Sequence, residues 1–375
     1  MAARRAAMGA RMILERYLMR RIGGTFLMVS GIFLGMLLLL DMVEQMFRLA
    51  GQSVSIGQIV QLSALNLPEG FYEIAPLVLM LSAMWVGLGW SRTSEVVVIR
   101  AIGRSVPRLV ILPAVAVLVV SMVFVAVMNP LVAGASREYD RTMAQIRDTP
   151  TSVATISAQG LWLRQADAQG QTVIHASSAE ATGTILRDVT FLVFHATEGV
   201  TRRLYAERAE LRPGLWQLDE VKLWDLSALN PEQSAEFQQR LDVPTDLTPE
   251  QIRDSFGQVR AIPLMQLPGF IATLERAGFA ALEHRMRLNM ELALPIMLTG
   301  MMLLALALSI HHMRAGSAGV RALITILAGF ALFFLRNFAQ VLGESGQIPV
   351  ILAAWGLPVA TLLLAIGVML NLEEV

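Results

Sequence analysis

The feature that most constrains this chain is a series of long apolar runs with almost no charge. A membrane-spanning helix needs about 20 predominantly apolar residues. The runs of about that length are Ile22–Leu40, Ile74–Trp90, Leu109–Ser136, Leu292–Ile310, Ala322–Gly343 and Ile348–Leu370. Charged residues make up 16% of the chain, against about 25% in an ordinary soluble domain. We therefore predict a polytopic α-helical membrane protein with six transmembrane helices, the first of them uncleaved and the second extended backwards through Phe71 and Tyr72.

The short segments between these runs predict the orientation. The N-terminal tail carries six arginines, the loop Ser91–Arg108 four and the loop His311–Arg321 two, whereas Asp41–Glu73 and Glu344–Gln347 share one. Positive charge stays on the cytoplasmic side of a membrane. We therefore expect both termini in the cytoplasm, a cell inner-membrane location, and the long segment after the third helix in the periplasm.

That segment reads as a β domain. Residues 189–195 and 203–211 are strand-like, Arg212–Gly214 is a turn, and Leu215–Leu226 looks like another pair of strands. Many short strands without long helices suggest a sandwich or a jelly roll, with a strand order that stays open. The expected parts are residues 1–136 with helices 1–3, residues 137–266 as the periplasmic β-jelly-roll domain, and residues 267–375 with an amphipathic interfacial helix (Pro263–Leu282) and helices 4–6.

The sequence lacks the signatures of common enzymes. The sole lysine, Lys222, lies in a strand-like segment rather than in the glycine loop of a Walker A motif, and there is no HExxH, GxSxG or cysteine. His311 and His312 are adjacent, so they would point about 100° apart on a helix, which favours an interfacial anchor over a metal site. We expect no catalytic residues, no metal and no cofactor.

The loop Ser91–Gly103 predicts a short helix on the cytoplasmic side. Ser91 or Thr93 could cap it, and Gly103 would end it. One interpretation is an interfacial helix lying on lipid, and the other is a coupling helix that docks onto a cytosolic ATPase. The residues assigned to that coupling are Glu95, Val96, Val97 and Arg100.

Several arginines on the non-cytoplasmic side could bind an anionic headgroup. Arg137 and Arg141 follow the third run directly, and Arg336 interrupts the fifth. A charge at that depth costs at least about 2.5 kcal/mol, and the guanidinium fork suits phosphate. The alternatives are snorkelling to the headgroups or, for Arg336, pairing with Glu344. The predicted lipid-phosphate contacts are Arg48, Arg137, Arg141 and Arg336.

Beyond this pattern of helices and strands, short motifs over nearly the whole chain resemble the LptF/LptG (YjgP/YjgQ) family of lipopolysaccharide-export permeases. The motifs are Leu14–Tyr17, Glu44-Gln45 to Ala50-Gly51, Ser94–Val98 to Gly103, Gln159–Trp162, Asn230-Pro231, Asp246–Glu250 and Leu288–Met290. The Gln-Gly-Leu-Trp and Leu-Thr-Pro segments look more like LptG than LptF.

This resemblance implies a lipid transporter. In that family LptF and LptG form the membrane part of an ABC transporter with two LptB ATPases, extract lipopolysaccharide, and pass it through β-jelly-roll domains to LptC and the bridge protein LptA. Glu95 matches the family's coupling glutamate and Arg137 matches a lipid-phosphate contact. Asp41 stands where the family has a lysine, with Arg48 nearby, and Arg336 stands where some relatives carry an acidic residue.

Two other classes of protein compete with this interpretation. A polytopic enzyme acting on a lipid or peptide at the outer face would need titratable residues clustered inside the bundle, where only Arg336 interrupts a run. A mechanotransmitting subunit of another ABC system, such as lipoprotein release, usually has four spans rather than six.

Overall fold

A computed structural model gives the structure of most of the chain. It describes residues 2–52, 54–92, 106–147, 154–157, 160–167, 170–179, 184–195, 199–228, 230–245, 247, 261–276, 281–310 and 318–374. Internal contacts divide the chain into two compact units, Met1–Asp140 with Arg285–Val375, and Arg141–His284. Each unit is described by itself.

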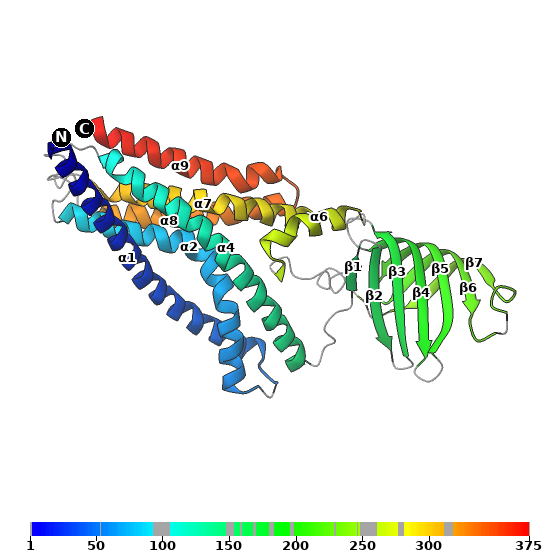
Figure 1. The fold of residues 1–375 in the computed structure, drawn as a ribbon. Coiled ribbons are helices and arrows are strands. Elements are labelled where there is room, and N and C mark those ends of the chain that lie inside the picture. The colour runs from blue at the N-terminus through cyan, green and yellow to red at the C-terminus, as the bar shows by residue number, and fades with distance from the viewer. Residues whose placement is uncertain are drawn as a thin grey trace. The chain divides into compact units, whose positions relative to one another are not determined.

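Six helices of the described chain are long and apolar enough to cross a membrane, which confirms the six predicted spans (Figure 1). They are α1 (Ala2–Arg48), α2 (Ile56–Arg92), α4 (Val106–Arg147), α7 (Leu282–Ser309), α8 (Ala318–Glu344) and α9 (Val350–Glu374). Most extend beyond the apolar runs, because a helix continues past the hydrocarbon region as long as its backbone stays hydrogen-bonded.

Helices α2 and α7 form the centre of the helical unit. In their most apolar windows 67% and 83% of residues are buried, against 6% for α1 and 11% for α8. Glycines permit close approaches between helices: a Cβ on Gly329 of α8 would lie 3.1 Å from Leu77 of α2, and a Cβ on Gly300 of α7 would lie 3.0 Å from the backbone nitrogen of Leu362 on α9.

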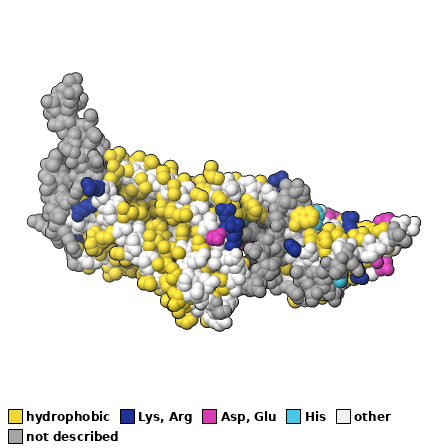
Figure 2. Space-filling model, turned by 60° about the horizontal axis from the view of Figure 1, so that its bottom comes forward, with side chains coloured by type: hydrophobic (Ala, Val, Ile, Leu, Met, Phe, Trp, Pro, Cys, Tyr) yellow, Lys and Arg dark blue, Asp and Glu magenta, His cyan; other side chains and the backbone are white. Residues whose placement is uncertain are grey.

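The outside of the helical unit is apolar. Large side chains such as Leu27 on α1, Phe334 on α8 and Leu363 on α9 are more than half exposed. Figure 2 shows hydrophobic side chains over this unit with few charges between them. Such a surface would promote aggregation in water, but it is the surface that lipid requires.

The second unit contains the predicted β domain, which is confirmed. Its described strands form one antiparallel sheet in the order β1-β2-β3-β4-β5-β6-β7. They are β1 (Ala154–Ser157), β2 (Gly160–Asp167), β3 (Gly170–Ala179), β4 (Ile185–His195), β5 (Gly199–Arg212), β6 (Leu215–Asp225) and β7 (Glu236–Pro244). The strand order is therefore a meander, and the described strands contain no Greek-key crossover of the kind that joins the two sheets of a standard jelly roll.

A transverse crease crosses five strands of this sheet. The backbone pairing keeps the same register on both sides of the crease. The crease itself is one row of residues, one from each strand, that is left out of this pairing: Ser177, Asp188, Glu207, Glu220 and Gln239. Asp188 and Glu220 have positive φ values of 49° and 51°. Since the left-handed region is unfavourable for residues other than glycine, the crease is a position where the backbone is held away from a regular strand.

The crease folds the sheet over its own apolar face. On β5 the neighbours Glu207 and Arg208 are both exposed while Ala206 and Ala209 are both buried, so the inside–outside alternation shifts there. Phe191 pairs with Leu204 of β5, and Trp216 pairs with Leu211 of the same strand. Leu204 and Leu211 are seven residues apart, so in a flat strand the two pairs would be separated by about 23 Å. The two rings are instead 6.3 Å apart, edge to face.

The crease also explains one wrong prediction. Leu215–Leu226 was expected to supply a pair of strands, but Leu215–Asp225 is the single strand β6. Glu220, at φ 51°, lies within this strand and does not end it. The turn expected at Arg212–Gly214 is confirmed, with Gly214 at φ 81°.

A short helical segment follows the β domain. It consists of η2 (Leu264–Gln266) and α6 (Leu267–Arg276), and α6 buries Leu267, Ile271 and Leu274 on one face. The helix predicted over Pro263–Leu282 is described as helical from Leu264 to Arg276, and residues 277–280 lie outside the described chain. Its amphipathic character is confirmed.

Candidate functional site: two polar clusters in the helical unit

A buried carboxylate joins three of the membrane helices. Glu291 of α7 is only 7% exposed, and it accepts a hydrogen bond from the Tyr72 hydroxyl of α2. The Asn129 side-chain amide of α4 donates to its other oxygen at 3.1 Å, and Arg287 Nε lies 3.7 Å away. We call these four residues the Glu291 cluster. A charge at this depth is tolerated only when it is paired and hydrogen-bonded, so the cluster ties α2, α4 and α7 together.

Arg336 belongs electrostatically to the same region. It is partly buried on α8, and the carboxylates of Glu291 and Glu73 stabilise its charge. Glu344, the alternative partner considered from sequence, instead accepts a hydrogen bond from Gln340 at 2.8 Å. The structure therefore places Arg336 near carboxylates of α2 and α7.

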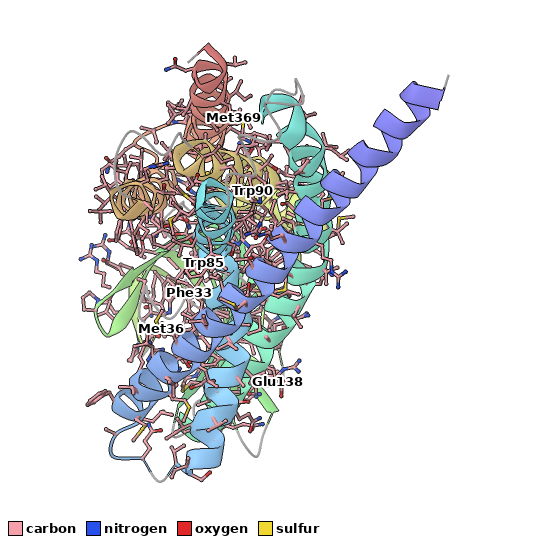
Figure 3. The ribbon with its side chains drawn as sticks, turned by 90° about the vertical axis from the view of Figure 1, so that its left-hand side faces the viewer. Phe33, Met36, Trp85, Trp90, Glu138 and Met369 are labelled. Atoms are coloured by element: carbon pink, nitrogen blue, oxygen red, sulfur yellow. The ribbon has the colours of Figure 1, made fainter. Side chains whose placement is uncertain are left out.

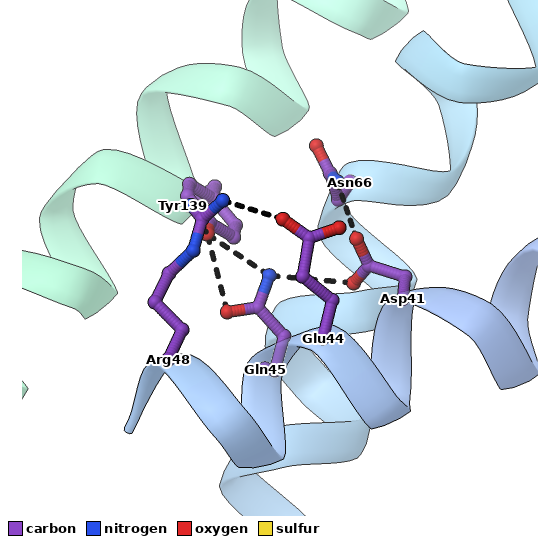
Figure 4. Close-up of polar contacts among 6 residues, drawn as sticks. All are labelled: Asp41, Glu44, Gln45, Arg48, Asn66 and Tyr139. Carbon is purple, nitrogen blue, oxygen red and sulfur yellow. Dashed lines mark hydrogen bonds and ion pairs between the residues drawn. The ribbon is translucent and has the colours of Figure 1, made fainter. Parts of the chain in front are cut away.

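A second group of polar residues lies where α1 ends. We call it the Arg48 cluster, and Figure 4 shows its six residues, Asp41, Glu44, Gln45, Arg48, Asn66 and Tyr139. Both oxygens of Asp41 face amides: Asn66 Nδ2 donates to one at 2.6 Å and Gln45 Nε2 lies 3.4 Å from the other. Gln45 Nε2 also donates to the Tyr139 hydroxyl at 3.0 Å. The end of α1 is therefore fastened to α2 through Asn66 and to α4 through Tyr139.

Arg48 completes this cluster from the solvent side. Its Nη2 lies 2.5 Å from Glu44 Oε1, with side-chain exposures of 47% and 59%, and its Nη1 lies 3.5 Å from the Tyr139 hydroxyl. Glu44 therefore pairs with Arg48 across one turn of α1. Asp41, by contrast, uses neutral partners.

Two more of the predicted phosphate-binding arginines are on the α4 end that carries Tyr139. Arg137 is exposed, and its Nε donates to its own helix at the Ala133 carbonyl, 3.1 Å away; Arg141 is exposed four residues later. Figure 2 shows basic side chains gathered beside an acidic one within apolar surroundings. Of the four predicted contacts, the described interactions thus associate Arg48 with the end of α4 and Arg336 with the Glu291 cluster.

The predicted coupling residues Glu95, Val96, Val97 and Arg100 lie outside the described residues, as do residues 93–105 generally. The helix that leads into them is described. Ser91 belongs to the last turns of α2, where its hydroxyl donates to the Ser309 carbonyl of α7 at 2.9 Å. Ser91 is therefore part of α2 and is held against α7.

The same end of α2 is packed tightly. A Cβ on Gly87 would lie 2.8 Å from the Ser309 side chain, and Trp90 is 2% exposed whereas Trp85 is 63% exposed. Figure 3 shows both tryptophans on α2, with Phe33 and Met36 on α1. The end of α2 is thus packed closely against α7.

Sequence reasoning missed the Glu291 cluster. Glu291 stands one residue before the fourth run, Tyr72 two residues before the second, and Asn129 inside the third. The available signal was Asn129, a polar residue in a charge-free run, since such residues usually face a partner helix. Among the described residues, no group of three or more His, Asp or Glu side chains could hold a metal ion.

The sequence of this chain matches one protein family. The family model described as "Lipopolysaccharide export system permease LptF/LptG" matches residues 16–371. No curated protein matches the chain.

Proposed function

Because the chain belongs to the LptF/LptG family of lipopolysaccharide export permeases, we propose that it is the LptG-like subunit of the transporter that extracts lipopolysaccharide from the inner membrane. Members of this family are permease subunits, so ATP hydrolysis is supplied by a separate chain. The observation that carries the proposal is the family match over nearly the whole length, on a chain with six spanning helices and an inserted antiparallel β domain.

The lipid headgroup contacts are assigned to exposed arginines near the end of α1 and the end of α4. Arg48 is half exposed and lies against Tyr139 of α4, and Arg137 is exposed two residues before Tyr139. We assign Arg141 and Arg336 to the same lipid. The reason for Arg336 is that its charge lies inside α8, one of the spanning helices. Guanidinium groups bind phosphate through two parallel hydrogen bonds, which suits a phosphorylated lipid.

The partners follow from the energetics of lipid extraction. Exposing acyl chains costs about 0.8 kcal/mol per CH₂, so the lipid must stay shielded and an ATPase must drive its movement. We assign an LptF-like permease subunit, a dimer of LptB ATPases, and LptC with the bridge protein LptA as partners. Glu95, Val96, Val97 and Arg100 would contact the ATPase from the cytoplasm, and the β domain would hand lipid over in the periplasm.

The proposal predicts that an LptB-like ATPase co-purifies with the chain after mild detergent extraction. We expect Glu95→Ala to lose or uncouple the ATPase, because the coupling contact is removed, while Glu344→Ala at the far end of α8 keeps it. ATP hydrolysis of the purified complex is measured with and without lipopolysaccharide. An ATPase that fails to co-purify with the wild-type chain would contradict the transporter assignment, and one that tolerates Glu95→Ala would remove Glu95 from the coupling site.

A further inference from the structure

The guanidinium of Arg48 is already occupied by an anion of the same chain. Glu44 lies one turn earlier on α1, and its Oε1 is 2.5 Å from Arg48 Nη2. The other carboxylate of the Arg48 cluster, Asp41, accepts hydrogen bonds from Asn66 and Gln45. The two carboxylates therefore have different tasks: Asp41 fastens α1 to its neighbours, and Glu44 holds the cation.

The pair is built for exchange rather than for stability. Both side chains are about half exposed, at 47% and 59%, and exposed ion pairs four residues apart on a helix contribute little to stability. A lipid phosphate offers more oxygen acceptors than a carboxylate, and a phosphomonoester also carries more charge. Since Arg48 Nη1 faces Tyr139 at 3.5 Å, the guanidinium keeps a fixed anchor on α4 while its other nitrogen changes partner.

We propose that Glu44 is an intramolecular competitor for the lipid phosphate, which occupies Arg48 when no lipid is bound and weakens the site so that the lipid can leave again. The inference rests on the proposed function in one respect, namely that Arg48 contacts the headgroup. A transport site must release its ligand, and an internal anion that returns to the cation lowers affinity without adding a separate step. Every anionic lipid must displace Glu44, so Glu44 lowers the affinity for all of them. The displaced carboxylate stays one turn away on α1 and repels the bound headgroup, and this repulsion is larger for a more highly charged headgroup.

The test compares lipid binding by the full-length chain in nanodiscs of phosphatidylcholine. Phosphatidic acid and phosphatidylglycerol are added as the phosphomonoester and phosphodiester probes, and binding is measured by native mass spectrometry. We expect Glu44→Gln to raise the affinity for both probes by about threefold to tenfold, with the larger increase for the more highly charged phosphomonoester. Glu344→Gln, which removes the same charge from the end of α8, serves as the matched control and should leave both affinities as they are.

A second variant separates this inference from the proposed function. Arg48→Gln should lower both affinities, and in the double variant Glu44→Gln should no longer have an effect. If Arg48→Gln weakens binding but Glu44→Gln does not strengthen it, the competitor role is wrong and the headgroup role of Arg48 stands. If Arg48→Gln changes nothing, Arg48 is not a headgroup contact and both ideas fail at this residue.

Inorganic phosphate distinguishes the lipid from a free anion of the same chemistry. It is titrated against the wild type and Glu44→Gln in the same nanodiscs. Saturable binding of inorganic phosphate to Glu44→Gln without any change in lipid binding would overturn the lipid assignment. An increase in affinity for the lipid probes alone, without binding of inorganic phosphate, would support the lipid assignment.

Discussion

At the scale of single residues, the helical unit depends on a few polar side chains that connect its helices. Glu291 has a hydroxyl, an amide and a guanidinium around it, drawn from three helices. These partners could not be derived from sequence, because residues 72, 129 and 291 become neighbours only through the packing of α2, α4 and α7. The Glu44–Arg48 pair could be predicted, since its members are four residues apart on one helix.

Replacing Glu291 with leucine should destabilise the protein strongly. Arg287 would keep its charge in a site where its side chain is only 15% exposed, and Tyr72 would lose its acceptor, so we expect a loss of about 3 kcal/mol. Glu291→Gln keeps an oxygen acceptor and should cost about 1 kcal/mol. Thermal unfolding in detergent, followed by tryptophan fluorescence, measures both; equal midpoints for the leucine variant and the wild type would show that the cluster has no structural role.

A residue of the β domain should titrate abnormally. The Tyr205 hydroxyl donates to Asp188 at 2.9 Å, and this hydrogen bond, with lesser contributions from burial and from the charges of Asp188 and Glu207, raises the pKa of Tyr205. A raised pKa means that the bond contributes fully below the ordinary tyrosine pKa and is lost as pH rises through the higher folded value. Asp188→Asn should lower the pKa of Tyr205, as read from tyrosinate absorbance. Tyr205→Phe identifies the signal, and a titration that Asp188→Asn leaves unmoved would contradict the assignment.

At the scale of elements, apolar runs and strand patterns predicted the helices and most strands, since both depend on local periodicity. The runs ended too early at several helices because charged residues such as Arg141 continue α4 beyond the apolar stretch. The crease could not be predicted. The crease requires five strands to bend at the same row of residues. Its two residues with positive φ, Asp188 and Glu220, are not glycines, so a positive φ there could not be recognised from the sequence.

Removing the unfavourable backbone conformation of Glu220 at the crease gives a prediction for the stability of the β domain. Glu220 has φ 51°, a conformation that costs a non-glycine residue roughly 1–2 kcal/mol. Glu220→Gly should therefore stabilise the β domain by about 0.5 kcal/mol after the entropy cost of glycine is subtracted. Glu207→Gly is the matched control on the same level of β5, without a positive φ, and should destabilise by about 0.5–1 kcal/mol. Chemical denaturation of the full chain compares them, and the same sign for both variants would show that φ is not what limits stability here.

At the scale of the whole molecule, an even number of spanning helices determines a simple topology. Six helices of the described chain are long and apolar enough to cross a membrane. We predict that each crosses once, which would return the chain to its starting side, place both termini in one compartment and place the insert between α4 and α7 in the other. Which compartment is which cannot be read from packing, because α-helices pack equally well in either direction across a bilayer. Only the distribution of arginines over the short loops decides it.

The chain contains no cysteine, so each engineered cysteine is the sole thiol and reports its own compartment. We introduce Ser227→Cys between β6 and β7, where the side chain is exposed, and Ser317→Cys between α7 and α8. Two arginines in the loop His311–Arg321, against the single Arg48 in the longer segment Asp41–Glu73, predict that a membrane-impermeant maleimide labels Ser227→Cys in intact spheroplasts. Ser317→Cys should react only after the membrane is opened. The reverse pattern would invert the topology, and would place the residues assigned to ATPase coupling on the side without ATP; labelling of both sites before lysis would contradict the six-span arrangement itself.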